Sequence, residues 1–148
     1  GEQRDLPKFH IHAGIRPLLF AAFFGHAAAV SVLVRGRAEV NASSRLGQPP
    51  LAYALLSSDM EVHQELFRSR ADASARDIFG GTCLDLAVMQ SKVDLVRFLL
   101  TTDVPRGCSE HGLNALHIAA TFDVPWEITS TLVEAGVSMT DCFRPRFG

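Results

Sequence analysis

The hydrophobic and polar positions of the chain recur in blocks of about 33 residues. A glycine opens each block, and the steps between these glycines are 33, 33 and 32 residues. A leucine follows each glycine after four residues, and an alanine follows it after seven. The three columns are Gly14, Gly47, Gly80 and Gly112; Leu18, Leu51, Leu84 and Leu116; and Ala21, Ala54, Ala87 and Ala119. Three columns that share one period indicate an internal repeat.

Each block predicts two short helices joined by a tight turn. Apolar residues recur at helical spacing in both halves of a block, and Gly25, Ser58 or Ser91 interrupts them. The first helices are expected at 17–24, 50–57, 83–90 and 115–122, and the second helices at 27–35, 60–68, 93–100 and 125–134. Residues suited to helix starts precede or open six of them: Pro17, Pro50, Thr82, Asn114, Asp59 and Asp123.

The stretch PLLFAAFFGHAAAVSVLV, residues 17–34, also fits a membrane span when it is read alone, because His26 is its one ionisable residue. The corresponding stretches of the next two blocks carry charges, among them Asp59 and Glu61, then Asp85 and Lys92. A charge at the centre of a bilayer costs about 2.5–3.5 kcal/mol. We therefore interpret residues 17–34 as two helices that meet at a turn, and we expect no membrane contact.

The charge balance argues against a nucleic-acid partner. The 148 residues carry a net charge of −2, and arginines alternate with acidic residues along the chain. Proteins that neutralise many phosphates usually show a basic stripe instead. Cys83, Cys108 and Cys142 are too few and too widely spaced for a disulfide framework or a CxxC metal pair, which favours reduced thiols in a cytoplasmic or nuclear protein. The charged first thirteen residues do not resemble a signal peptide.

Helices of eight to ten residues do not persist alone in water, so the apolar columns must be buried between neighbouring blocks in a stacked array. The first block reads GIRPLLFAAFFGHAAAVSVLVRGRAEVNA, and the fourth opens with GLNALHIAA. A 33-residue unit that opens with Gly-x-Thr-Pro-Leu-His-x-Ala-Ala is typical of the ankyrin repeat. The chain resembles that family over residues 14 to about 140.

The resemblance implies an all-α fold, an ankyrin-type helix-turn-helix solenoid with loop or β-turn fingers. It divides the chain into a lead-in segment or cap at 1–13 and repeats at 14–46, 47–79, 80–111 and 112–148, the last including the C-terminal end. Ankyrin arrays act through protein–protein contacts, usually on a concave side formed by loop tips and the exposed face of the first helices. The positions that match this side are His12, Ile15, Phe23, Phe24, Arg45, Leu46, Gln48, Leu56, Ser57, Ile78, Phe79, Met89, Gln90, Glu110, His111, Leu113, Thr121 and Phe122.

Large apolar side chains recur in this set, nine or ten residues after each glycine: Phe23, Phe24, Leu56, Met89 and Phe122. A row of exposed aromatic and methionine side chains normally marks an interaction site. The hypothesis is a groove that takes an amphipathic helix or an extended peptide. In the alternative, some of these rings fold inward or are covered by residues 1–13.

Other residues suggest chemistry less strongly. His10 and His12 form an H-x-H pair without further zinc ligands nearby, and Cys108, Glu110 and His111 are adjacent in sequence rather than convergent from separate elements. Asn41, which follows Val40, resembles asparagines that are hydroxylated in other ankyrin proteins. His26 is expected to be structural, as it is in the family.

The predicted function is that of a noncatalytic scaffold or adaptor that binds a partner peptide, helix or domain. The alternative is the substrate-targeting arm of a larger enzyme, such as a ubiquitin ligase subunit. A catalytic domain is the third class, but no phosphate-binding glycine loop, metal-ligand cluster or nucleophile motif supports it. We expect no cofactor, no metal and a monomer.

Overall fold

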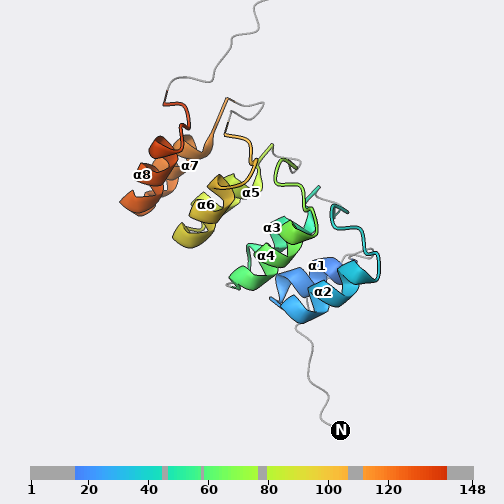
Figure 1. The fold of residues 1–148 in the computed structure, drawn as a ribbon. Coiled ribbons are helices and arrows are strands. Elements are labelled where there is room, and N and C mark those ends of the chain that lie inside the picture. Colours follow the sequence, from blue (N-terminus) through green and yellow to red (C-terminus); the bar gives the residue numbers. More distant parts are fainter. Residues whose placement is uncertain (1–15, 45–46, 58, 77–79, 107–111, 140–148) are drawn as a thin grey trace, which may run out of the picture.

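The computed structural model describes residues 16–44, 47–57, 59–76, 80–106 and 112–139. These residues form α-helices and no strand. In chain order the helices are α1 (Pro17–Phe23), α2 (Ala27–Arg35), α3 (Pro50–Ala54), α4 (Met60–Arg68), α5 (Cys83–Met89), α6 (Val93–Leu100), α7 (Ala115–Phe122) and α8 (Trp126–Glu134). They are arranged as four helix pairs that stack in chain order (Figure 1).

The two helices of each pair contact each other, and successive pairs pack through like helices. Helix α1 contacts α3, α3 contacts α5 and α5 contacts α7, while α2 contacts α4 and α6 contacts α8. The turns inside the pairs lie along one side of the stack, and the loops between pairs lie along the other (Figure 1). The predicted fold class is therefore confirmed: the chain is an all-α, ankyrin-type helix-turn-helix solenoid.

Residues 17–34 form two helices, as the repeat predicts. Helix α1 ends before Gly25, which has a φ of 74°, and α2 begins at Ala27. A positive φ is easy for glycine, which explains a tight reversal at this position. Among the described residues, no helix combines the length and the apolar character needed to cross a membrane.

Local capping explains where most helices begin. Pro17 and Pro50 are the first residues of α1 and α3, as predicted. Thr82 forms a capping box with Asp85 at α5, and Asn114 forms one with His117 at α7. The Asp59 carboxylate accepts the Glu61 N–H at 2.9 Å at the start of α4. These side chains satisfy backbone N–H groups that a first helical turn leaves free.

Four helix bounds differ from the predictions, and those of α1 and α5 differ only by ending one residue earlier. Asp123 does not cap α8; it ends α7 in the left-handed conformation with a φ of 48°, and Pro125 precedes α8, which begins at Trp126 rather than at 125. Helix α3 ends at Ala54 and does not reach residue 57, because the N–H groups of Leu55 to Ser57 donate to carbonyls three residues earlier. Such tighter bonds commonly replace the last helical turn.

The core forms where successive pairs meet. The positions of Ala22, Leu55 and Val88 are fully buried, whereas Ala120, the equivalent residue of the fourth pair, is exposed. Val30, His63 and Val96 are likewise buried on the second helices, and their equivalent Thr129 is exposed. Each of these residues is therefore covered by the following pair, and the fourth pair carries the uncovered end face of the described stack.

Candidate interaction surface

Four large apolar side chains are exposed near the ends of the first helices of the four pairs. Phe24 is 43% exposed, Leu56 56%, Met89 39% and Phe122 51%. Each lies at or just after the last turn of α1, α3, α5 or α7. We call these residues the apolar row: Phe24, Leu56, Met89 and Phe122. Phe24 and Phe122 follow their repeat glycines by ten residues and Leu56 and Met89 by nine, so the row draws on two adjacent repeat positions at the ends of the first helices.

Aromatic contacts order the first end of the row. The Phe23 and Phe24 rings meet edge to face with centroids 5.0 Å apart, and the Phe20 ring stacks with Phe24 at 6.2 Å. His26 is exposed and also stacks near Phe24, with ring centroids 6.2 Å apart. Edge-to-face and offset rings at these distances attract one another, so Phe24 is held in place although it is exposed.

The hydroxyl groups beside the row are bound to their own helices. Ser57 Oγ donates to the Ala54 carbonyl at 2.9 Å, and Thr121 Oγ1 donates to the His117 carbonyl at 2.8 Å. The described part of the row and its neighbours Ser57, Gln90 and Thr121 carry no charged side chain. The row is thus apolar, and the two hydroxyl groups beside it are already hydrogen-bonded.

The other predicted site residues are distributed as follows. Phe23, Gln48, Ser57 and Gln90 are half-buried, while Thr121 and Leu113 are exposed, Leu113 by 46%. The exposure of Phe24 and Phe122 contradicts inward folding of those two rings. The remaining predicted residues lie outside the described part of the chain: His12, Ile15, Arg45, Leu46, Ile78, Phe79, Glu110 and His111.

Asn41 links two of the loops between pairs. Its side-chain amide donates to the Arg70 carbonyl at 3.3 Å, and its side-chain oxygen accepts the Asp72 N–H at 2.8 Å. These contacts tie the loop after α2 to the loop after α4. Asn41 therefore has a structural role, whereas its hydroxylation stays a prediction.

The sequence reading missed a polar feature between the second and third pairs. His63 is 1% exposed in α4, at the position that valine occupies in α2 and α6. Its Nδ1 lies 3.0 Å from the Asp59 carbonyl, which can only accept, so Nδ1 carries the hydrogen. Its buried Nε2 has no partner. Burial lowers the pKa of His63 below the usual 6.5, and the nearby Lys92 charge lowers it further.

Lys92 bridges the same two pairs. Its ammonium group donates to the Leu55 carbonyl and, at 2.7 Å, to the Ser57 carbonyl, both just beyond α3. Partial burial lowers the pKa of Lys92. A cavity of about 220 Å³ adjoins these groups and is lined by Ser57, Met60, His63, Lys92, Val93, Asp94 and Leu95. The bridge explains how the third pair is fastened to the end of α3.

Reactive and metal-binding groups are sparse in the described residues. No group of three or more His, Cys, Asp or Glu residues in them could hold a metal ion. Cys83 is buried, and burial raises the pKa of its thiol to about 12, so it remains protonated and a poor nucleophile. The candidates His10, His12, Cys108, Glu110 and His111 lie outside the described residues.

The fold and the row define a class of protein: an ankyrin-type solenoid with a line of exposed apolar side chains. No model of a known protein family matches the chain. The chain is similar to "Probable E3 ubiquitin-protein ligase XBOS33" from Oryza sativa subsp. japonica, with 33% identity over 112 residues, which covers 74% of this chain and 22% of the relative. It is also 31% identical over 102 residues to "E3 ubiquitin-protein ligase XBAT33" from Arabidopsis thaliana, covering 68% of this chain and 20% of the relative. The chain thus spans about a fifth of the length of either relative.

Proposed function

We propose that the chain is an array of ankyrin repeats that binds another protein through the apolar row. The observation that carries this proposal is the presence of an exposed large apolar side chain near the end of the first helix in each of four successive pairs. Single exposed apolar residues are common on proteins, but a contiguous apolar line is typical of an interaction surface. The repeats of this proposal span 14–46, 47–79, 80–111 and 112–148.

Burial of the row by a partner contributes to the free energy of binding. Full burial of a side chain of this size contributes about 1.5–3 kcal/mol, so covering the exposed half of each contributes about 1 kcal/mol. Loss of two row residues should therefore weaken binding by about 2 kcal/mol, which is roughly 30-fold in Kd. This magnitude is large enough to separate row variants from controls.

The test uses three row variants and a matched control. Phe24→Ser and Phe122→Ser, alone and combined, are compared with Val32→Ser, since Val32 is 67% exposed but lies on α2. Partners captured from a lysate are identified by mass spectrometry, and the Kd of each purified partner is then measured. The expected result is a roughly 30-fold loss for the double variant and no change for Val32→Ser. Equal binding by all four variants, with the helical circular dichroism signal intact, would refute the proposal.

The relatives favour a specific setting for this binding. Both are named as E3 ubiquitin-protein ligases, and the similarity covers about a fifth of each. We propose that the chain corresponds to a noncatalytic part of such an enzyme and acts as its substrate-targeting arm. Protein partners captured by the row are then substrates for ubiquitin transfer by another domain.

This second proposal has its own test. The chain is incubated with ubiquitin, an activating enzyme, a conjugating enzyme and a captured partner, both alone and fused to a domain that recruits the conjugating enzyme. The chain alone is expected to transfer no ubiquitin, while the fusion modifies the partner only when Phe24 and Phe122 are intact. Equal modification of the partner with and without Phe24 and Phe122 would contradict the targeting role and leave the binding result unaffected.

A further inference from the structure

We propose that the occupant of the apolar row is an amphipathic helix whose apolar stripe is flanked by basic residues. This inference rests on the proposed function and names the class of partner. The arguments for it are the spacing that stacked helix pairs impose on the row, the hydrogen bonds already made beside the row, and the charge of one side of the stack.

The spacing of the row suits a helix that lies along the stack. Packed helices are about 8–10 Å apart, so four stacked pairs place the ends of the row roughly 30 Å from each other. A helix of about 20 residues has this length at 1.5 Å per residue. Its residues seven apart lie on nearly the same face about 10.5 Å from one another, so one partner side chain meets each pair.

The polar groups beside the row favour a helix over an extended peptide. The hydroxyls of Ser57 and Thr121 already donate within their own helices, and the described residues contain no strand edge to which a peptide could add. An extended segment pressed on this surface would leave its N–H and C=O groups unpaired, which costs free energy. A helix satisfies these groups internally.

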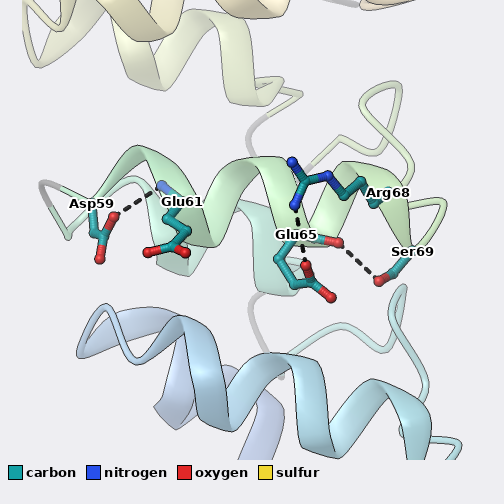
Figure 2. A network of polar contacts seen from close by, with 5 residues as sticks. All are labelled: Asp59, Glu61, Glu65, Arg68 and Ser69. Atoms are coloured by element: carbon teal, nitrogen blue, oxygen red, sulfur yellow. Dashed lines mark hydrogen bonds and ion pairs between the residues drawn. The ribbon is translucent and has the colours of Figure 1, made fainter.

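The charge of the turns inside the pairs favours basic residues on the partner. Five acidic residues lie along these turns, and we call them the acidic edge: Asp59, Glu61, Asp94, Asp123 and Glu127. They lie in these turns or in the first turn of the second helix, close in sequence to the row. Figure 2 shows Asp59 and Glu61 together at the start of α4, where the Asp59 carboxylate accepts the Glu61 N–H.

No ion pair neutralises the acidic edge within the described residues, whose ion pairs are Arg16–Glu39 and Glu65–Arg68. The Glu65–Arg68 pair lies further along α4 (Figure 2). Lys92 lies on the same side, where its charge offsets one of the five acidic charges, so the edge keeps a net negative charge. Complementary charge accelerates association and selects the partner, so lysines or arginines on one flank of the stripe fit this edge.

The experiment uses synthetic 21-residue peptides and the 148-residue chain. The lead peptide has leucines along one helical face, with matches seven residues apart, and lysines on one flank. Three companions differ from it in one respect each: a central proline, glutamate in place of lysine, or a scrambled order that breaks the stripe. Affinities come from titration calorimetry, and helix formation from circular dichroism of the mixtures.

The lead peptide is expected to bind and become helical, and the Phe24→Ser, Phe122→Ser double variant to bind it roughly 30-fold more weakly. Proline should weaken binding by roughly a hundredfold, because it breaks the helix interior. The glutamate peptide and the scrambled peptide should each bind at least tenfold more weakly than the lead peptide. The variant that combines Asp59→Asn with Glu61→Gln keeps a capping residue at α4. It should bind the lysine peptide more weakly than the wild type and with a smaller dependence on salt, whereas the control Asp103→Asn should change neither.

The outcomes separate this inference from the proposed function. If the proline peptide binds as tightly as the lead peptide and still needs Phe24 and Phe122, the helical occupant is wrong while binding by the row stands. If no peptide binds, or if the acidic-edge variant changes nothing, the inference is overturned. If partners from the lysate also bind the Phe24→Ser, Phe122→Ser double variant as tightly as the wild type, the proposed function fails as well.

Discussion

Replacement of His63 by valine is expected to stabilise the protein, although it removes a buried hydrogen bond. The buried Nε2 of His63 has no partner, and an unsatisfied polar atom of this kind costs about 1–3 kcal/mol. Valine already occupies the equivalent, fully buried positions 30 and 96. The substitution thus places in α4 the residue that the same packing site accepts in α2 and α6.

Two losses oppose this gain. The bond from Nδ1 to the Asp59 carbonyl disappears, which costs about 0.5–1.5 kcal/mol. The smaller side chain leaves about 10–15 Å³ unfilled, which costs roughly 0.3 kcal/mol at the usual cavity penalty. Valine and histidine have similar helix propensities, so that contribution cancels. The net expectation is a free energy of unfolding higher by about 0.5–1 kcal/mol at pH 7.5.

The pH dependence gives an independent check with a defined sign. Burial lowers the pKa of His63 in the folded state, while the unfolded state keeps a value near 6.5. Below pH 6.5 the unfolded chain therefore binds more protons than the folded chain, and the free energy of unfolding falls as the pH falls. The valine variant lacks this contribution, so its advantage over the wild type should widen between pH 7.5 and pH 5.5.

Urea unfolding followed by circular dichroism at the two pH values measures both effects. His26→Ala is the matched control, because it removes an exposed histidine from a helix N-cap without touching the core. The prediction is refuted if the free energy of unfolding of His63→Val at pH 7.5 is more than 1 kcal/mol below the wild-type value and the difference between the two proteins is the same at pH 5.5.

Three further predictions follow from buried or capped groups. Lys92→Met should destabilise the fold by about 1–2 kcal/mol in urea unfolding, because two carbonyls beyond α3 lose a charged donor; Lys92→Arg serves as the control and should lose less. Cys83 should react with a thiol reagent at pH 8 only after unfolding, since it is 3% exposed and the pKa of its thiol is raised to about 12; rapid reaction of this residue in the native chain would contradict its burial. Thr82→Ala should cost about 1 kcal/mol, because the capping box with Asp85 is lost, whereas Thr82→Ser should retain most of the stability.

The sequence predicts correctly those helix ends that depend on residues within one turn of the end. Helices α2, α4 and α6 have the predicted bounds, and Pro17, Pro50, Thr82 and Asn114 mark helix starts because they act within one turn of their own position. Asp123 was wrongly predicted as the N-cap of α8, because asparagine and aspartate favour both N-caps and the left-handed conformation. The extra residue in the turn before α8 decides which of the two Asp123 adopts.

The site was predictable in part for the same reason. The repeat period places Phe24, Leu56, Met89 and Phe122 at two adjacent repeat positions, nine or ten residues after each glycine, but an apolar residue at a repeat position is equally compatible with a core until burial is known. Lys92 could not be identified because its acceptors belong to another helix pair, and the burial of His63 could not be identified because it depends on the pair that follows. The Lys92 acceptors lie 35 and 37 residues away, and no local pattern encodes such contacts.

Hydrogen–deuterium exchange of the chain, with and without a bound partner, tests most directly whether the apolar row is the binding surface. The account predicts slower exchange on binding at the ends of α1, α5 and α7 and in the turn after α3, where the row residues lie. Exchange in the middle of α2, α4, α6 and α8 should stay unchanged. Protection confined to those second helices, or to the end face of the fourth pair, would contradict the account.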